Sequence, residues 1–311
     1  MKKIIILGGS GFIGLNLVDH FSKKYLIIAT YKNKKPSQKF KNTRWIKADL
    51  TKKINLKNFC KNAECVFICS AITSGAKNIV SKPEMFVSNN AIINTNIISG
   101  IYNIGIKHIF FFSCTVMYSN SNKAKGESDF NLETCEKKYY GGAVMKIYTE
   151  NLCNFFSRIS KTKFTVIRHS NTYGPYDKFN KSEGHFFCSA ISKITNAKNE
   201  VKVWGPGKEK RNFIHIDDVI NAIKILKKKQ KNSYEIVNVA DNKSYSIREI
   251  VKKMINCSKK NLKIVHDLSK PSINVDLLIS SQKMKKKYKW KPQISIENGI
   301  RKTFDWYKQN Y

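Results

Sequence analysis

The sequence has no long hydrophobic run. Nowhere in its 311 residues is there a stretch of ~18 unbroken apolar residues, the length that a membrane-spanning helix needs. The first apolar stretch, Ile4 to Leu7, is too short for the core of a signal peptide. We therefore expect a soluble, cytoplasmic protein without a membrane partner. The length is that of a large α/β unit with a smaller second part.

The eight cysteines lack the close paired spacing that binds zinc. They are scattered along the chain, at positions 60, 65, 69, 114, 135, 153, 188 and 257. This spacing predicts no metal site, and the thiols are expected to be reduced and mostly buried.

Acidic residues and arginine are both scarce. The formal net charge is +35, from 57 basic and 22 acidic residues, and only six of the basic residues are arginine. Such a charge alone would indicate nucleic acid or an anionic surface as a partner. Phosphate recognition, however, tends to recruit the arginine fork, and abundant Lys, Ile and Asn together are typical of an AT-rich coding bias. Nucleic acid is therefore not expected, and the lysine runs 227–229 and 285–287 are predicted to be solvated faces.

The chain begins with a strand, a tight turn and a helix. A β-branched run ends in Gly8-Gly9-Ser10-Gly11-Phe12-Ile13-Gly14, and an apolar helical pattern follows at once. Glycine at 8, 11 and 14 removes side chains that would keep a pyrophosphate from backbone N–H groups at the helix N-terminus, and Gly14 lets the helix lie close on the strand. This context indicates a dinucleotide-binding turn; the alternative is an ordinary strand-to-helix turn.

Further apolar runs alternate with helical patterns. The expected strands are 25–30, 44–50, 65–71, 107–113 and 165–168, with helices at 87–102 and within 136–159. This order predicts an α/β fold with a Rossmann-type doubly wound parallel sheet. From Asn171 onward Gly, Pro, Asn and aromatic residues become frequent, which indicates a smaller C-terminal α/β substrate-binding region.

The end of the second expected strand bears on the cofactor. An enzyme specific for NAD usually has an acidic residue there, which binds the ribose hydroxyls. Here Tyr31-Lys32-Asn33 follows instead, and Lys32 can contact a 2′-phosphate, so NADP is slightly favoured over NAD. Asp49 and Leu50, at the end of the third strand, are placed to meet the adenine.

Short motifs are spread from one end of the chain to the other. With the glycine turn they comprise Asp49-Leu50, Cys114-Thr115-Val116-Met117-Tyr118, Lys146 followed by Glu150, Arg168-His169-Ser170-Asn171-Thr172-Tyr173-Gly174-Pro175, Trp204-Gly205-Pro206-Gly207, Arg211 to Val219, and Trp290-Lys291-Pro292. In these motifs the chain resembles the extended short-chain dehydrogenase/reductase family, in its NAD-dependent epimerase/dehydratase branch. It is most similar to the GDP-fucose synthase subgroup, through Gly174 to Phe179 followed by His185 and, weakly, through residues 71–76.

The resemblance implies an NAD(P)-dependent oxidoreductase or epimerase that acts on nucleotide sugars. A GDP-linked hexose or heptose is the candidate substrate, and hydride transfer at C4 of the sugar is the first step. Residues 1–170 and 212–243 would bind the dinucleotide, and residues 171–211 and 244–311 the nucleotide sugar. A homodimer is expected through the helices that include 92–102 and 145–156. The alternative is a member with a degraded active site that binds a nucleotide sugar or RNA.

Four residues are candidates for the substrate side. Asn171 and Arg211 fall where the family contacts the nucleotide diphosphate, and arginine suits that task through its bidentate fork. Trp204 would pack near the base or in the core. His185 matches the acid of the subgroup's epimerisation, although a lone histidine is more often structural. In the subgroup a cysteine is the partner of this histidine, and Val116 stands at its position here. Epimerisation at two positions of the sugar would therefore lack one of its two residues.

The family's chemistry needs a tyrosine and a lysine one helical turn apart, so that both face the nicotinamide ribose. Lys146 fits the pattern, but the residue four before it is Gly142, and Tyr139 and Tyr140 lie further upstream. In the favoured interpretation Gly141 and Gly142 make an irregular helix start that brings Tyr140 into the site as the acid/base. In the other, the tyrosine role is lost or is taken by water or another group.

The hydroxyl that normally binds the reacting sugar oxygen is also replaced. Four residues before Tyr118 the chain has Cys114, whose thiol is a much weaker donor. Thr115 or Ser113 are alternative donors, and a buried structural role for Cys114 is the other interpretation.

Overall fold

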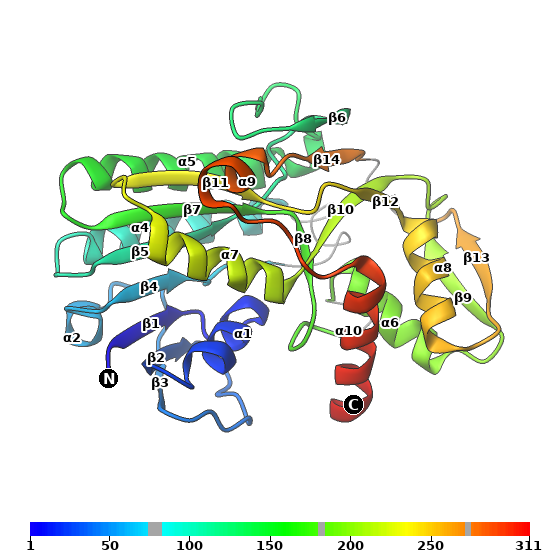
Figure 1. Cartoon of the computed structure of the whole chain (residues 1–311), viewed down its shortest axis with the longest axis horizontal. Coiled ribbons are helices and arrows are strands. Elements are labelled where there is room, and N and C mark those ends of the chain that lie inside the picture. Colours follow the sequence, from blue (N-terminus) through cyan, green and yellow to red (C-terminus); the bar gives the residue numbers. More distant parts are fainter. Residues whose placement is uncertain (74–82, 180–183, 271–274) are drawn as a thin grey trace.

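Seven strands form the central sheet of the computed structural model, which describes residues 1–73, 83–179, 184–270 and 275–311 (Figure 1). In chain order they are β1 (Lys3–Leu7), β2 (Leu26–Tyr31), β3 (Thr43–Lys47), β4 (Cys65–Ile68), β5 (His108–Ser113), β7 (Lys163–His169) and β11 (Tyr234–Val239). Their order in the sheet is β11-β7-β5-β4-β1-β2-β3, and every neighbouring pair is parallel. The predicted doubly wound parallel sheet is therefore confirmed. Its order reverses between β1 and β4, the kind of position where such sheets bind ligands.

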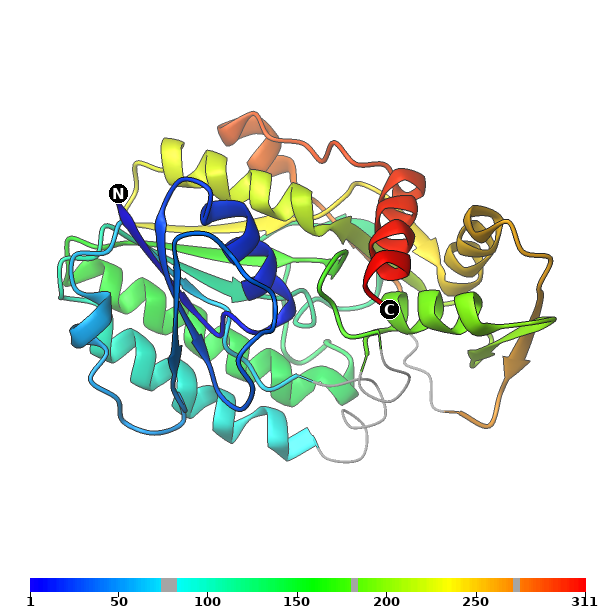
Figure 2. The same cartoon turned by 90° about the horizontal axis from the view of Figure 1, so that it is seen from below.

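Helices cover both faces of this sheet, as Figure 2 shows from below. One layer consists of α1 (Phe12–Phe21), α7 (Ile216–Lys229) and α9 (Gln282–Tyr288), and the other of α2 (Lys57–Cys60), α4 (Ser88–Ile101) and α5 (Tyr140–Arg158). Successive strand residues alternate between the layers: Ile4 and Ile6 pack toward α1, and Ile5 and Leu7 toward α4. Burial on both faces explains why the inner strands β1, β4 and β5 read as nearly continuous apolar runs.

A second region has its own core beyond the end of β7. Its strands are β8 (Asn171–Tyr173), β10 (Lys210–His215) and β12 (Ser244–Ser246) in one sheet, β9 (Glu200–Trp204) with β13 (Lys263–Asp267) in another, and β14 (Leu277–Ile279) with β6 (Ser121–Lys125) in a third. The helices α6 (Phe186–Asn196), α8 (Ile247–Ser258) and α10 (Ile296–Asn310) enclose its core. Two 3-10 turns, η1 (Pro83–Phe86) and η2 (Lys137–Tyr139), complete the described elements.

The segment around α9 returns to the first region. Met284, Tyr288 and Trp290 pack into the core on the α1 face of the central sheet. The domain division expected from the sequence places all of 244–311 in the second region, so this segment is an exception to it.

The two lysine runs are not wholly solvated, contrary to the prediction. Lys227 forms an ion pair with Glu64 at 3.4 Å, and its ammonium lies 5.2 Å from the centre of the Tyr25 ring. Lys287 forms an ion pair with Glu235, a carboxylate that is almost fully buried. Part of the positive charge therefore stabilises the fold itself.

The eight cysteines are free thiols, and five of them are buried. Within 1–73, 83–179, 184–270 and 275–311 no group of three or more His, Cys, Asp or Glu side chains is arranged to hold a metal ion. In the same residues no helix combines the length and apolarity needed to span a membrane. Residues 74–76, part of the 71–76 segment compared above, lie outside the described residues.

Candidate active site

The glycine turn leaves room for a ligand at the start of α1. Gly8 has φ of 82°, and its N–H donates to Thr30 Oγ1 at 2.9 Å, which ties the turn between β1 and α1 to the neighbouring strand β2. A Cβ on Gly14 would lie 2.4 Å from the Gly8 carbonyl oxygen, so only glycine lets α1 approach the turn this closely. Gly11 caps α1 without a side-chain hydrogen bond, so the first-turn N–H groups of Phe12 and Ile13 are available to an anion. These residues fit a dinucleotide pyrophosphate.

Lys32 and Asp49 form an ion pair beyond the ends of β2 and β3. The Lys32 ammonium lies 3.2 Å from Asp49 Oδ1, and about half of the Lys32 side chain is exposed. Asp49 also accepts hydrogen bonds from the Thr51 hydroxyl at 2.7 Å and its N–H at 3.1 Å, which lower the pKa of the Asp49 carboxyl. The structure therefore brings together two residues that the sequence assigned to different parts of the cofactor.

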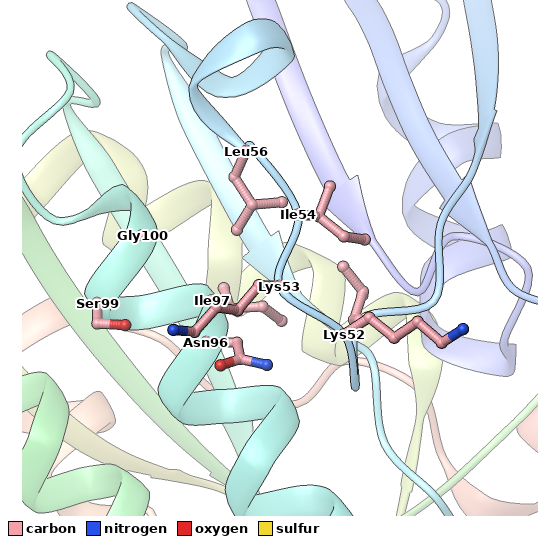
Figure 3. A pocket seen from close by; sticks show the side chains of 9 residues that line it. Lys52, Lys53, Ile54, Leu56, Asn96, Ile97, Ser99 and Gly100 are labelled. Carbon is pink, nitrogen blue, oxygen red and sulfur yellow. The ribbon is translucent and has the colours of Figure 1, made fainter.

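A pocket of about 240 Å³ borders this end of the site (Figure 3). It lies between the segment after β3 and the helix α4, and Leu50, Lys52, Lys53, Ile54, Leu56, Asn96, Ile97, Ser99 and Gly100 line it. Asn96 Nδ2 donates to the Thr51 carbonyl at 3.3 Å, which ties α4 to this segment. None of the catalytic candidates lines the pocket, so it is a hollow beside the predicted adenine contacts and not the reaction centre.

Lys146 reaches the carboxyl end of β5 from α5. Its ammonium donates to the Phe112 carbonyl at 2.8 Å and lies 4.8 Å from the centre of the Phe111 ring. Burial lowers the pKa of Lys146, while the nearby Cys114 and Glu150 act in the opposite direction. Lys146 therefore lies at the edge of the sheet toward which the glycine turn also opens.

A buried ion pair one helical turn further along clamps α5 to the sheet. Arg168 Nη2 and Nε donate to the two oxygens of Glu150 at 2.6 and 3.0 Å, and Ser113 Oγ donates to the same carboxylate at 2.6 Å. Arg168 Nη1 also donates to Tyr118 Oη at 2.9 Å, and Tyr118 donates to Asn238 Oδ1 at 2.8 Å. Burial raises the pKa of Tyr118 to about 12. Ser113 and Tyr118 therefore have structural roles in this hydrogen-bond network. The sequence motifs contain its residues, but the network was not predicted from them.

The start of α5 differs from the favoured prediction. Tyr140 has φ of −50° and ψ of −52° and begins a helix that continues through Gly141 and Gly142. The irregular start that would turn Tyr140 into the site is absent, and 53% of the Tyr140 side chain is exposed. No described residue would lie within 4 Å of a Cβ on Gly142, so the described part of the chain leaves open space where the family has its tyrosine. The tyrosine directed toward the second region is Tyr139.

Arg211 and Asn171, two of the candidate substrate residues, lie on neighbouring strands of the second region. Arg211 Nη1 lies 3.4 Å from the Tyr139 hydroxyl, and the strand that carries it pairs with β8, which begins at Asn171. Asn171 Nδ2 donates to the Asn212 carbonyl at 3.0 Å. Trp204 ends β9, where its ring lies under the Lys193 ammonium at 5.3 Å, a contact within the second region.

His185 and Cys114 are two further candidates, one before α6 and the other after β5. His185 caps α6 from an exposed position, and its field lowers the pKa of the buried Asp177, although burial dominates and raises it. Burial also raises the pKa of the Cys114 thiol, and the nearby charge of Lys146 acts in the opposite direction. At neutral pH the thiol is therefore a proton donor and not a base. Thr115 is buried directly after Cys114.

His169 is a residue of this region to which the sequence motifs assigned no role. It ends β7, and its Nδ1 lies 3.0 Å from the Ser170 carbonyl and 2.9 Å from the Thr172 hydroxyl. The signal in the sequence that could have pointed to His169 is its position inside the motif Arg168 to Pro175.

Comparison with known proteins places this site in a family. The chain matches the sequence model described as the NAD dependent epimerase/dehydratase family over residues 4–240, and it belongs to that family. GDP-L-colitose synthase of Yersinia pseudotuberculosis is 26% identical over 314 residues, which cover 98% of this chain and 97% of the relative. GDP-L-fucose synthase 1 of Arabidopsis thaliana is 24% identical over 318 residues, covering 99% and 94%.

Solved structures show the same fold. UDP-glucose 4-epimerase from Thermotoga maritima, solved with UDP-glucose, superimposes with a TM-score of 0.86 at 22% identity and 99% coverage of both chains. A GDP-6-OMe-4-keto-L-xylo-heptose reductase from C. jejuni gives a TM-score of 0.82 at 22% identity, covering 100% of this chain and 98% of its own.

Proposed function

We propose that the protein is an NAD(P)-dependent nucleotide-sugar oxidoreductase or epimerase that begins with hydride transfer at the sugar C4. The observation that carries the proposal is the placement of Lys146, whose ammonium is held at the Phe112 carbonyl, 2.8 Å away, at the sheet edge. A bound dinucleotide would supply the hydride acceptor or donor. Lys146 would hold its ribose, and the glycine turn its pyrophosphate.

The substrate proposal is a GDP-linked hexose or heptose. It is supported by the names of the relatives, GDP-L-colitose synthase and GDP-L-fucose synthase, which the chain matches over nearly its whole length. Arg211 and Asn171 would contact the diphosphate from the second region, where the guanidinium can bind phosphate oxygens in a bidentate manner. His185 and Trp204 stay proposed substrate contacts. Val116 stands where epimerisation needs its second acid. Oxidation or reduction at C4 alone does not need an acid at that position.

The cofactor proposal is NADP, with NAD as the alternative. The exposed part of Lys32 offers a cation near the end of β2, and the pair with Asp49 holds that cation in place. A 2′-phosphate would compete with Asp49 for the ammonium, so the measured ratio of NADP and NAD affinities decides between the two.

A homodimer through α4 and α5 is the proposed assembly. Ile92, Tyr148 and Phe155 on these helices and Ile159 directly after α5 are 45%, 41%, 55% and 54% exposed. Apolar side chains this exposed on one helical layer favour a partner surface. A cytoplasmic location stays a prediction that cell fractionation would test.

The competing function is binding without turnover, which the open space at Gly142 favours. Both functions are tested by one experiment. The dinucleotide that co-purifies is released and identified, and a panel of nucleotide sugars is then followed by absorbance of the reduced nicotinamide at 340 nm. Turnover supports the enzyme, whereas dinucleotide binding with no turnover on any sugar supports the binding protein.

A further inference from the structure

His169 lies beside the strand end at which Lys146 is held. Ser113 and Arg168 are the last register partners of β5 and β7, so His169 follows directly at the carboxyl edge of the sheet. The rings of His169 and Phe112 are in edge contact, 6.2 Å apart, and the Phe112 carbonyl accepts from Lys146. The Phe112 ring packs on the α1 side of the sheet and Lys146 comes from α5 on the other side, so the imidazole and the ammonium approach the same strand end from opposite faces.

The hydrogen bonds of His169 determine which ring nitrogen can take a proton. Nδ1 lies 3.0 Å from the Ser170 carbonyl, and a carbonyl can only accept, so Nδ1 carries the hydrogen. The Thr172 hydroxyl, which donates to the same carbonyl at 3.1 Å, can accept from Nδ1 at 2.9 Å. Nε2 is then left with its lone pair, and no described residue forms a hydrogen bond with it.

Among the described residues of α5 and of the segment after β5, no tyrosine or thiolate is placed to take up a proton here. The position one helical turn before Lys146 is Gly142, beside which the described residues leave open space. Tyr140 is exposed, Tyr139 contacts Arg211, and burial raises the pKa of the Cys114 thiol. A sugar hydroxyl beside Lys146 would therefore meet no phenol.

We propose that His169 is the catalytic acid/base of this site and replaces the absent tyrosine; the proposal rests on the function proposed above. In oxidation the hydride, with its electron pair, would leave the sugar carbon for a bound oxidised dinucleotide. The hydroxyl proton passes to Nε2, so the C–O bond becomes a carbonyl and the imidazole an imidazolium. In reduction the imidazolium returns this proton to the carbonyl oxygen as hydride arrives.

The electrostatic surroundings favour the neutral ring. Burial lowers the pKa of His169 to about 4, the Ser170 carbonyl opposes this, and the charges of Lys146 on α5 and His185 before α6 lower it further. At neutral pH the lone pair on Nε2 is therefore available. Once protonated, the ring beside Lys146 is a strong proton donor, as the reverse reaction requires.

The experiment uses His169→Gln, which keeps a polar side chain of similar size, with His20→Gln on the last turn of α1 as the matched control. The expected loss in kcat is about 100- to 10,000-fold for His169→Gln, the usual contribution of a general acid/base, and none for the control. Calorimetric affinity for NAD(P) should be unchanged in both variants. The double variant His169→Gln/Gly142→Tyr should regain turnover, because the new phenol would face Lys146, whereas His169→Gln/Gly142→Phe should not.

The pH profile separates a catalytic from a structural role. The oxidative kcat of the wild type should fall toward acid pH with an apparent pKa between about 4 and 6.5, and the rescued variant should lose activity at higher pH, because tyrosine titrates near pH 10 in water. Unchanged kcat and profile in His169→Gln would overturn the assignment. The assignment to His169 would also be overturned if the wild type were inactive and the single variant Gly142→Tyr turned over. The proposed substrate class would still stand after that result. Absence of turnover in both would overturn the proposed function as well. If His169→Gln does not fold, the wild-type profile alone decides.

Discussion

Removing the Glu150 carboxylate should destabilise the protein more than any exposed ion pair does. Glu150 accepts two hydrogen bonds from Arg168 and one from Ser113, and the Arg168 side chain is only 2% exposed. In Glu150→Ala the guanidinium would stay buried without a counter-charge. Breaking one partner of a buried pair costs about 3–5 kcal/mol, and the loss of the Ser113 acceptor adds about 1 kcal/mol.

The assay is thermal unfolding followed by circular dichroism, with Glu297→Ala as the matched control. Glu297 also pairs with a cation, Lys253 at 2.6 Å, but its side chain is 56% exposed, so its loss should cost roughly 1 kcal/mol or less. For a chain of this size the buried change corresponds to a midpoint lower by roughly 5–15 °C, and the exposed change to roughly 3 °C or less. Equal shifts in the two variants would refute the claim that the Glu150–Arg168 pair clamps α5 to the sheet.

Three further substitutions test other parts of the site. Gly14→Ala should abolish NAD(P) binding in calorimetry, because the added Cβ would lie 2.4 Å from the Gly8 oxygen; retained affinity would contradict the closeness of α1 to the turn. Lys32→Ala should weaken NADP by about 10- to 100-fold, the worth of one charge-assisted hydrogen bond, and leave NAD unchanged; equal losses for both would remove Lys32 from the 2′-phosphate site. Phe155→Lys should convert a dimer into a monomer in light scattering, because a charge would enter the apolar face of α5; an unchanged mass would place the interface elsewhere.

Much of the first region could be predicted from the sequence. Parallel strands buried on both faces appear as uninterrupted apolar runs, so β1, β4 and β5 were visible as such. The glycine turn was predictable because its three glycines stand directly between a strand and a helix. Both signals are local, which is why they survive without knowledge of the tertiary structure.

The second region and the catalytic details could not be read in the same way. Strands β8 and β12 have three residues each, too few to show a period. The position of Tyr140 depends on whether two glycines distort a helix, and glycine permits either outcome. The pairing of Lys227 with Glu64 joins residues 163 positions apart, so nothing in the local lysine run predicts it.

The most direct test of the proposed function is transfer of deuterium from C4 of a GDP-hexose or GDP-heptose labelled at that carbon. The purified protein is incubated with the labelled sugar and with NAD or NADP, and the dinucleotide is then analysed by mass spectrometry. We predict a reduced dinucleotide one mass unit heavier than that from unlabelled sugar, formed by the wild type and not by Lys146→Ala. Unlabelled dinucleotide after incubation with every sugar of the panel, from a protein that binds NAD(P), would contradict hydride transfer at C4.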